Sequence, residues 1–323
     1  MINVKSLTLF SGLFAFIVVA LGAWTRMVDA GLGCPDWPGC YGFATIPLSN
    51  EDIVVANERF PESPYQLVKA IPEVVHRFFA TSLGLFIIGI FYLLTKHNIG
   101  SRNTKVLSFF LLIWVCIQGL LGYLTVSLKL WPQVVSAHLM AGFLTTIILW
   151  ILYFRIKDVK DLRIPWKFSQ RAYNLISIGI ILVTVQIFLG VWTSANYAAL
   201  ACSEFPLCYG EILPEADFIE AFNLTQPIGA SFLGGQLDHE SRLAIHLAHR
   251  FGALFLMIYL LFLAYMLNKD GHLNLSLGLL GLLFLQISLG ISNIIFHLPL
   301  LVAVGHNLGA LFLIIYLSVL RFR

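Results

Sequence analysis

The stretch IPEVVHR at residues 71–77 lies where a long polar segment ends and a long apolar run begins. The stretch AIHLAHR at residues 244–250 occupies the same kind of position much later in the chain. Both stretches end in His-Arg and continue into an apolar run, but Glu73 of the first corresponds to His246 of the second. We therefore predict two related helices that carry these side chains on their first turn and differ in one of them.

The composition excludes a soluble domain. Of the 323 residues, 59% are hydrophobic and only 11% are charged, whereas soluble proteins have about 25% charged residues. A helix needs roughly 20 apolar residues to cross the hydrocarbon layer of a membrane. We predict an all-α membrane protein with eight such helices, near residues 7–26, 74–95, 106–126, 135–154, 173–193, 242–266, 275–296 and 302–320.

The charges predict the orientation of these helices. Lys and Arg residues near helix ends stay on the cytoplasmic side. If the N-terminus is inside, the inner segments hold most of the 20 basic residues and the long outer segments collect acidic ones, so both termini should be cytoplasmic. The absence of an Arg/Ser-rich transit segment favours a bacterial inner membrane over a mitochondrial one. The net charge of +3 gives no sign of a nucleic-acid surface.

The two halves of the chain match each other at a nearly constant spacing. The matching pairs are residues 21–25 with 189–193, 34–42 with 202–210, 118–122 with 286–290, and His138 with His306, all 168 residues apart, and His76 with His249, 173 apart. Such regular matches predict an internal duplication. Each half contains four helices, so the halves enter the membrane in the same direction, as parallel repeats. We expect two four-helix bundles, residues 1–157 and 158–323.

Four of the nine histidines fall near the outer ends of helices that run from outside to inside: His76, His138, His249 and His306. Two histidines at equal depth in one bundle can supply both axial ligands of a haem iron. The alternative is a histidine that hydrogen-bonds to a neighbour or a lipid headgroup. Zinc is favoured less, because its sites need three or four converging ligands.

Other side chains accompany these histidines. Arg77 and Arg250 can pair with a haem propionate or extend to lipid phosphates, and both roles stay open. The outer cysteines are expected to form two disulfides, with a redox-active pair as the alternative, and Cys116 is expected to be a small core residue. These cysteines are Cys34 with Cys40 and Cys202 with Cys208. Glycines in the first and third helices of each half, such as Gly22, suit close helix packing in lipid.

Together these features resemble the haem A synthase family over nearly the whole chain. The resemblance rests on the eight spans in two halves, GLGCPDWPGC at residues 31–40, EVVHR at 73–77, His138, His249 with Arg250, and His306. It implies oxidation of a methyl substituent of haem O to a formyl group, which gives the haem A of terminal oxidases. It further implies that His76 and His138 flank the iron of the substrate haem, and that His249 and His306 ligate a resident haem b.

Glu73 lies one helical turn before His76, so both project from one face. As a catalytic residue, its carboxylate can move protons or stabilise charge beside the oxidised methyl; alternatively, it is an acid favoured by the helix dipole. His246 at the matching place suits a half that only carries electrons. It also leaves two candidates for iron, of which His249 is favoured because it aligns with His76.

The expected partners are membrane lipid, haem O, haem A, haem O synthase, a terminal oxidase assembly factor and an electron donor, with a homo-oligomer left open. The haem sites should face the outer side of the membrane. Two other functions stay open. One is a dihaem carrier of the cytochrome b type that passes electrons and alters neither haem, and the other is a haem transporter or chaperone.

Overall fold

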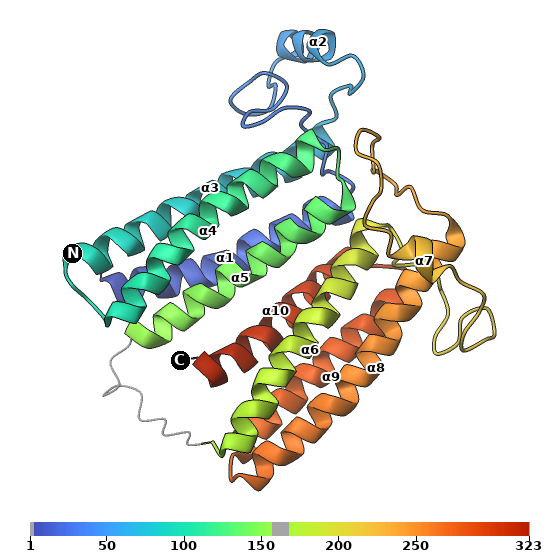
Figure 1. Cartoon of the computed structure of the whole chain (residues 1–323). Helices are drawn as coiled ribbons and strands as arrows, with labels where there is room; N and C mark the ends of the chain where they lie inside the picture. The colour runs from blue at the N-terminus through green and yellow to red at the C-terminus, as the bar shows by residue number, and fades with distance from the viewer. Residues whose placement is uncertain (1–2, 157–167, 323) are drawn as a thin grey trace.

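A computed structural model describes residues 3–156 and 168–322, and all regular elements in these residues are α-helices (Figure 1). In these described ranges the helices are α1 (Val4–Met27), α2 (Asn50–Arg59), α3 (Leu67–Lys96), α4 (Arg102–Ser127), α5 (Pro132–Ile156), α6 (Gln170–Ala195), α7 (Phe218–Ala221), α8 (His239–Lys269), α9 (Leu273–Ile295) and α10 (Leu300–Phe322). The boundary expected near residue 157 lies outside the described residues.

Within the described residues, eight helices are long and apolar enough to cross a membrane, and they correspond to the eight predicted spans. The all-helical, multi-pass class is therefore confirmed. The other two helices, α2 and α7, lie in the long segments that join α1 to α3 and α6 to α8, and the apolar pattern does not predict them. These segments are the ones expected on the outer side, and we call them the outer loops and their end of the helices the outer end. Ser49 and Asp52 form a capping box at the start of α2, which satisfies backbone N–H groups of a short polar helix.

The prediction that Glu73, His76 and their counterparts in the second half lie on the first turn of their helices was wrong. Helix α3 begins at Leu67 and contains Pro72, so Glu73 and His76 lie on its second and third turns rather than on the first. Helix α8 likewise begins at His239, several residues before the apolar run. In both cases the helix extends beyond its apolar part, because backbone hydrogen bonding continues through residues that a hydropathy pattern assigns to the loop.

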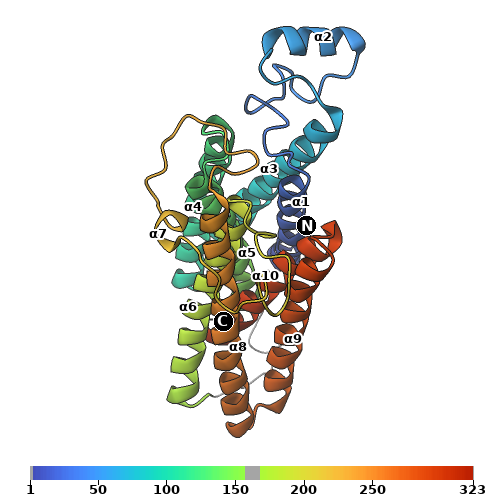
Figure 2. The same ribbon diagram turned by 90° about the vertical axis from the view of Figure 1, so that its right-hand side faces the viewer.

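The long helices form two groups. Helices α1, α3, α4 and α5 contact one another in a closed ring, and α6, α8, α9 and α10 do the same. Figures 1 and 2 show these groups side by side, with the segments that carry α2 and α7 at the same end of the helices. Helices α1, α5, α6 and α10 make the contacts between the two groups.

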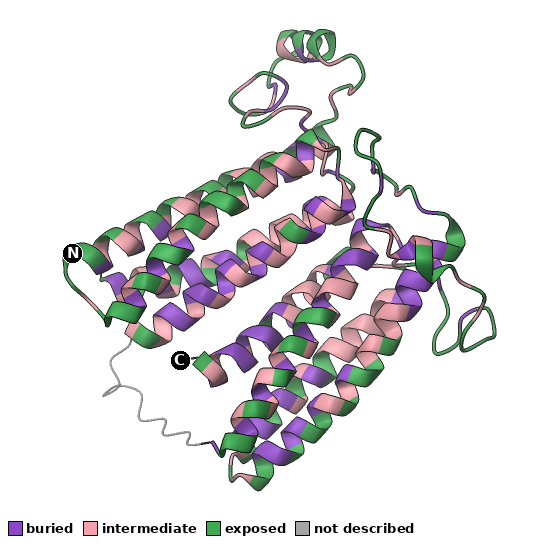
Figure 3. Ribbon diagram, viewed as in Figure 1, coloured by how far each residue is buried: buried purple, intermediate pink, exposed green. Residues whose placement is uncertain are grey.

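Buried and exposed apolar residues are distributed as in a membrane protein. Figure 3 shows buried residues on helix faces turned toward other helices and exposed residues on outward faces. Some outward residues are large and apolar: Phe284 is 75% exposed and Leu301 is 84% exposed. Such surface is unfavourable in water but is matched by lipid chains, and each helix satisfies its backbone hydrogen bonds internally.

Polar contacts also join the two groups. At the outer end, the Arg26 guanidinium carbon lies 3.8 Å from the ring centre of Tyr197 and its Nη2 donates to the Ser194 carbonyl oxygen. The Tyr197 hydroxyl donates to Asp29 Oδ1 at 3.0 Å, and its burial raises the pKa of Tyr197. At the other end, Arg155 Nη2 donates to the Phe322 carbonyl oxygen at 3.0 Å.

Candidate functional site

The structure brings together two pairs of histidines, one in each group of helices. The ring centres of His76 on α3 and His138 on α5 are 6.4 Å apart, with an angle of 84° between the rings. Those of His249 on α8 and His306 on α10 are also 6.4 Å apart, with an angle of 83°. The two sites therefore have nearly the same geometry.

Each of the four imidazoles lies against a glycine of a neighbouring helix. A Cβ atom added to that glycine would approach the imidazole Cε1 closely: 3.0 Å for Gly22 and His76, 3.2 Å for Gly122 and His138, 3.0 Å for Gly190 and His249, and 3.1 Å for Gly290 and His306. Such distances are tighter than ordinary carbon contacts, which are about 3.5–4.0 Å. These glycines therefore give room to the histidines, in addition to the helix packing expected from the sequence.

The geometry of each pair suits two axial ligands of one metal ion. Imidazoles bound on opposite sides of an ion through bonds of about 2.0 Å place their ring centres roughly 6 Å apart. All four histidines keep part of their surface accessible, and Nδ1 of His76, His138 and His306 is buried without a hydrogen-bond partner among the described residues. Since no cluster of three or more metal-ligating residues occurs in the described ranges, the donor set fits a haem iron better than zinc.

Three glutamines, which the prediction did not assign to the site, contact these histidines. Gln118 Nε2 donates to the His138 carbonyl oxygen at 2.9 Å. Gln186 Nε2 lies 2.9 Å from the His249 carbonyl oxygen and 3.0 Å from its Nδ1. Gln286 Nε2 lies 3.4 Å from His306 Nε2. Gln118 and Gln286 match in the repeat, which was the one signal in the sequence that pointed to them.

Glu73 joins α3 to the first outer loop. It is 4% exposed, its Oε2 accepts a hydrogen bond from the Cys34 backbone N–H at 2.8 Å, and its other oxygen pairs with the Arg77 guanidinium. Arg77 Nη1 also donates to the carbonyl oxygens of Asp36 at 2.9 Å and Gly39 at 2.6 Å. The carboxylate and the guanidinium thus hold the loop over the outer end of α3.

The second half builds the same arrangement around His246. Its Nδ1 lies 3.4 Å from the Cys202 backbone N–H, and its Nε2 accepts from Arg250 Nε at 3.1 Å. Arg250 Nη2 donates to the carbonyl oxygens of Cys202 at 2.9 Å and Glu204 at 2.7 Å. Both ring nitrogens of His246 thus face these partners, and it is His249 whose ring lies opposite that of His306.

The cysteines of the outer loops pair as predicted. Cys34 is bonded to Cys40, with Cα atoms 4.8 Å apart, and Cys202 to Cys208, with Cα atoms 5.4 Å apart. Tyr41 packs beside the first pair, and its burial there raises the pKa of its hydroxyl. The prediction for Cys116 was wrong: it is a free cysteine on the exposed face of α4, where lipid rather than a protein neighbour can accommodate a small side chain.

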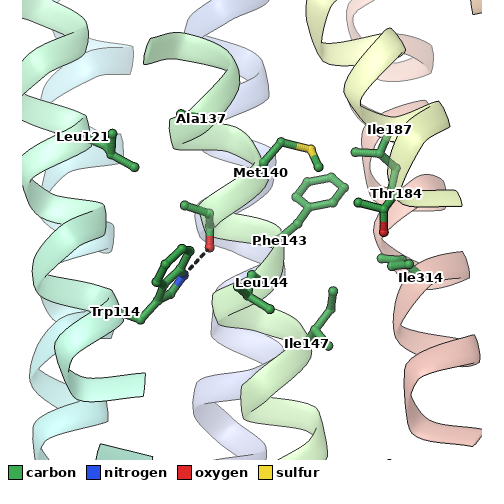
Figure 4. Close-up of a pocket in the computed structure, with 11 residues that line it drawn as sticks. Trp114, Leu121, Ala137, Met140, Phe143, Leu144, Ile147, Thr184, Ile187 and Ile314 are labelled. Carbon is green, nitrogen blue, oxygen red and sulfur yellow. Dashed lines mark hydrogen bonds between the residues drawn. The ribbon is translucent and has the colours of Figure 1, made fainter. Parts of the chain in front are cut away.

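A separate cavity of about 340 Å³ lies between the two halves. Its wall is apolar and comes from α4, α5, α6 and α10, with Trp114, Met140 and Ile314 among the lining residues (Figure 4). Thr184 supplies a hydroxyl, and Trp114 Nε1 donates to the Ala141 carbonyl oxygen at 3.1 Å. None of the paired histidines lines this cavity, so it is distinct from both histidine sites.

The fold and the two sites define a class, that of polytopic helical membrane proteins with two paired-histidine sites. Residues 5–318 match the model of a family described as cytochrome oxidase assembly protein, COX15-CtaA. The chain is 41% identical to a heme A synthase of Shewanella oneidensis, over 96% of this chain and 93% of the relative. It is 27% identical to a heme A synthase of Rickettsia bellii, over 92% and 91%. The chain therefore belongs to the COX15-CtaA family.

Proposed function

We propose that this protein is a haem A synthase, which oxidises a methyl substituent of haem O to the formyl group of haem A. The observation that carries the proposal is the 41% identity to a heme A synthase over 96% of the chain. The paired histidines support it, because the substrate and the product are both haems and need axial ligands. Terminal oxidases are the destination of the product.

We propose that the two halves divide the work. In residues 1–157, His76 and His138 would hold the iron of the substrate haem O. In residues 158–323, His249 and His306 would hold a resident haem b, which supplies an electron-transfer centre when bound. The difference between Glu73 and His246 supports this division, because at this position of the repeat only the first half carries an acidic group. Arg77 and Arg250, which hold the outer loops, are proposed to pair with a propionate of the haem in each half.

Glu73 is proposed to hold or move a proton beside the reacting methyl. Its buried position one turn from His76 supports this role. Its contacts with Cys34 and Arg77 also support a purely structural role, which is to anchor the loop. The two roles predict different behaviour, because a glutamine at this place can still accept the Cys34 N–H but cannot carry the negative charge.

The test is analysis of the haems extracted from cells that express the protein together with a supply of haem O. We expect the wild type to produce haem A, and Glu73→Ala and Glu73→Gln to lower its yield at least 100-fold, which is within the usual contribution of an acid or base of about 10²–10⁴-fold. Both variants should retain haem b. A normal haem A yield from Glu73→Gln would show that the reaction does not need the negative charge of Glu73. Glu73 would then serve only to anchor the loop.

One observation favours a second function. The two histidine pairs have the same ring separation of 6.4 Å, as expected of a dihaem electron carrier with two equivalent sites. The same extraction separates the two functions. A carrier would yield only haem b even when haem O is supplied, whereas a synthase yields haem A.

The duplication is also part of the proposal. Arg26 contacts Ser194 and Asp29 contacts Tyr197, and the members of each pair are 168 residues apart. This is the spacing that separates matching residues of the two halves. Contacts between equivalent positions are expected where a two-fold axis relates two copies. They support parallel repeats related by an axis along the membrane normal.

We further propose that the protein lies in a bacterial inner membrane, with both termini cytoplasmic and both histidine sites toward the outer face. The distribution of basic residues and the bacterial relatives support this placement. The partners proposed are membrane lipid, haem O synthase, a terminal oxidase assembly factor and an electron donor.

A further inference from the structure

We propose that Gln186 is a positioning residue that fixes the imidazole of His249, and that the lack of its counterpart in the first half leaves His76 free to exchange its ligand. This inference rests on the proposed haem sites. It concerns why one site would keep its haem while the other releases a product.

Three of the four histidines share the same surroundings. A glutamine of a neighbouring helix contacts each of them, at the backbone carbonyl of His138, at the carbonyl and Nδ1 of His249, and at Nε2 of His306. A glycine follows each histidine by three or four residues and lies beside that glutamine. The sets are His138 with Gln118 and Gly142, His249 with Gln186 and Gly252, and His306 with Gln286 and Gly309. At Gly252 and Gly309, an added Cβ atom would overlap the glutamine Oε1.

The fourth histidine, His76, lacks both partners. The residue of α1 that matches Gln186 in the repeat is Val18, and the residue that matches Gly252 is Phe79. Phe79 stacks on Phe14 of α1 with ring centres 5.2 Å apart, so aromatic packing replaces the amide contact. Among the described residues, Nδ1 of His76 has no hydrogen-bond partner, and neither has Nδ1 of His138 or His306; the contact of a glutamine with Nδ1 distinguishes His249 from the other three.

The contact with Gln186 can fix the ring of His249. A histidine that binds a metal through one nitrogen usually donates its other N–H to an acceptor, which sets the orientation and the basicity of the ring. A side-chain amide contains both a donor and an acceptor. Gln186 Nε2 lies within hydrogen-bond distance of both the His249 carbonyl oxygen and Nδ1, so the amide bridges the backbone and the ring and restrains the ring. Its Oε1 is buried without a partner among the described residues and is the acceptor available to a protonated Nδ1.

The difference between the halves agrees with the proposed division of work. A resident haem must stay bound through many turnovers, which a fixed ligand such as His249 favours. A substrate haem must enter and its product must leave. An orienting partner of a metal ligand typically contributes 10–100-fold to affinity, so its absence at His76 weakens retention there by a comparable factor.

The experiment measures how fast the purified holoprotein loses haem b to excess apomyoglobin, together with the electron paramagnetic resonance spectrum of its ferric haem. We expect Gln186→Val to release haem b at least about 10-fold faster and to shift the resonance of the bis-histidine haem. Gln186→Glu keeps an acceptor and should restore slow release. The control is Thr184→Val, which removes a hydroxyl from the same helix at a place that touches no paired histidine.

A second variant adds the missing contact instead of removing one. Misfolding would speed the release of haem, so the slower release expected here cannot result from misfolding. Val18→Gln with Phe79→Gly installs the missing pair beside His76 and should slow release of haem from the first half about 10-fold. Equal release rates for Gln186→Val and wild type would overturn the inference, as would a Gln186→Glu variant as fast as Gln186→Val. A wild-type protein without bound haem b would instead overturn the proposed function, and this inference with it.

Discussion

At the residue scale, each imidazole has room because the glycine that faces it on a neighbouring helix lacks a Cβ atom. Gly122 and Gly119 lie one turn apart on α4, but an added Cβ atom would meet His138 Cε1 at 3.2 Å from Gly122 and nothing within 4 Å from Gly119. The histidine sites therefore depend on particular glycines, and the other glycines of the same helix serve as controls.

We predict that Gly122→Val displaces the His138 ring and weakens haem binding by the first half about 10-fold or more, since overpacking typically costs about 1–3 kcal/mol. Titration of the purified protein with haem O measures this affinity. Gly119→Val introduces the same side chain into open space and should bind haem O as the wild type does. Equal losses in both variants would mean that the helix, and not the histidine, responds to the substitution.

The four paired histidines could be predicted because one residue type recurs at matching places in the repeat. Gln186 and Gly252 could not be predicted in this way. Their role depends on two helices that meet in space, and their counterparts Val18 and Phe79 differ from them in type. The contacts of Arg77 and Arg250 with loop carbonyls were missed for a similar reason, because a sequence pattern shows the charge of a guanidinium and not the direction of its N–H groups.

At the element scale, the outer loops are attached to the helices by charged side chains. Arg77 donates to the carbonyl oxygens of Asp36 and Gly39 and pairs with Glu73. The eight spans could be predicted from apolar length alone. The early starts of α3 and α8 could not be predicted, because their first turns lie outside the apolar runs.

We predict that Arg77→Met frees the first outer loop. Loss of hydrogen bonds to a charged group lowers the free energy of local opening by about 2 kcal/mol, which corresponds to roughly 30-fold faster amide exchange. Hydrogen exchange followed by mass spectrometry of peptides that cover residues 31–42 measures this rate. The control is Arg102→Met, because Arg102 is an exposed residue at the start of α4 and its replacement removes a guanidinium far from this loop in the sequence. Unchanged exchange in Arg77→Met would show that the remaining restraints, the contact of Glu73 with Cys34 and the disulfide, hold the loop without Arg77.

At the scale of the whole molecule, two similar bundles meet along α1, α5, α6 and α10. If they descend from a duplication, each half should fold as a unit and recognise the other. The polar contacts of Arg26 with Ser194 and Tyr197 lie in this interface.

We predict that two separate chains, divided between residues 157 and 167, assemble when they are expressed together. Affinity purification of one half should recover the other, and Arg26→Ala should reduce the recovery several-fold, because it removes the stacking on Tyr197 and the hydrogen bond to Ser194. Arg59→Ala, within the first half, should leave the recovery unchanged. Recovery that does not depend on Arg26 would assign the association to the other contacts between the halves, which are the apolar helix contacts and the polar contacts of Asp29 and Arg155.

The division of work between the halves is tested most directly by the haem content of His138→Ala, purified from cells supplied with haem O. The variant should contain one haem b per chain, because His249 and His306 are intact, and it should yield no haem A. Haem A production by this variant, or the loss of its haem b, would contradict the assignment of the substrate to the first half and of the resident haem to the second.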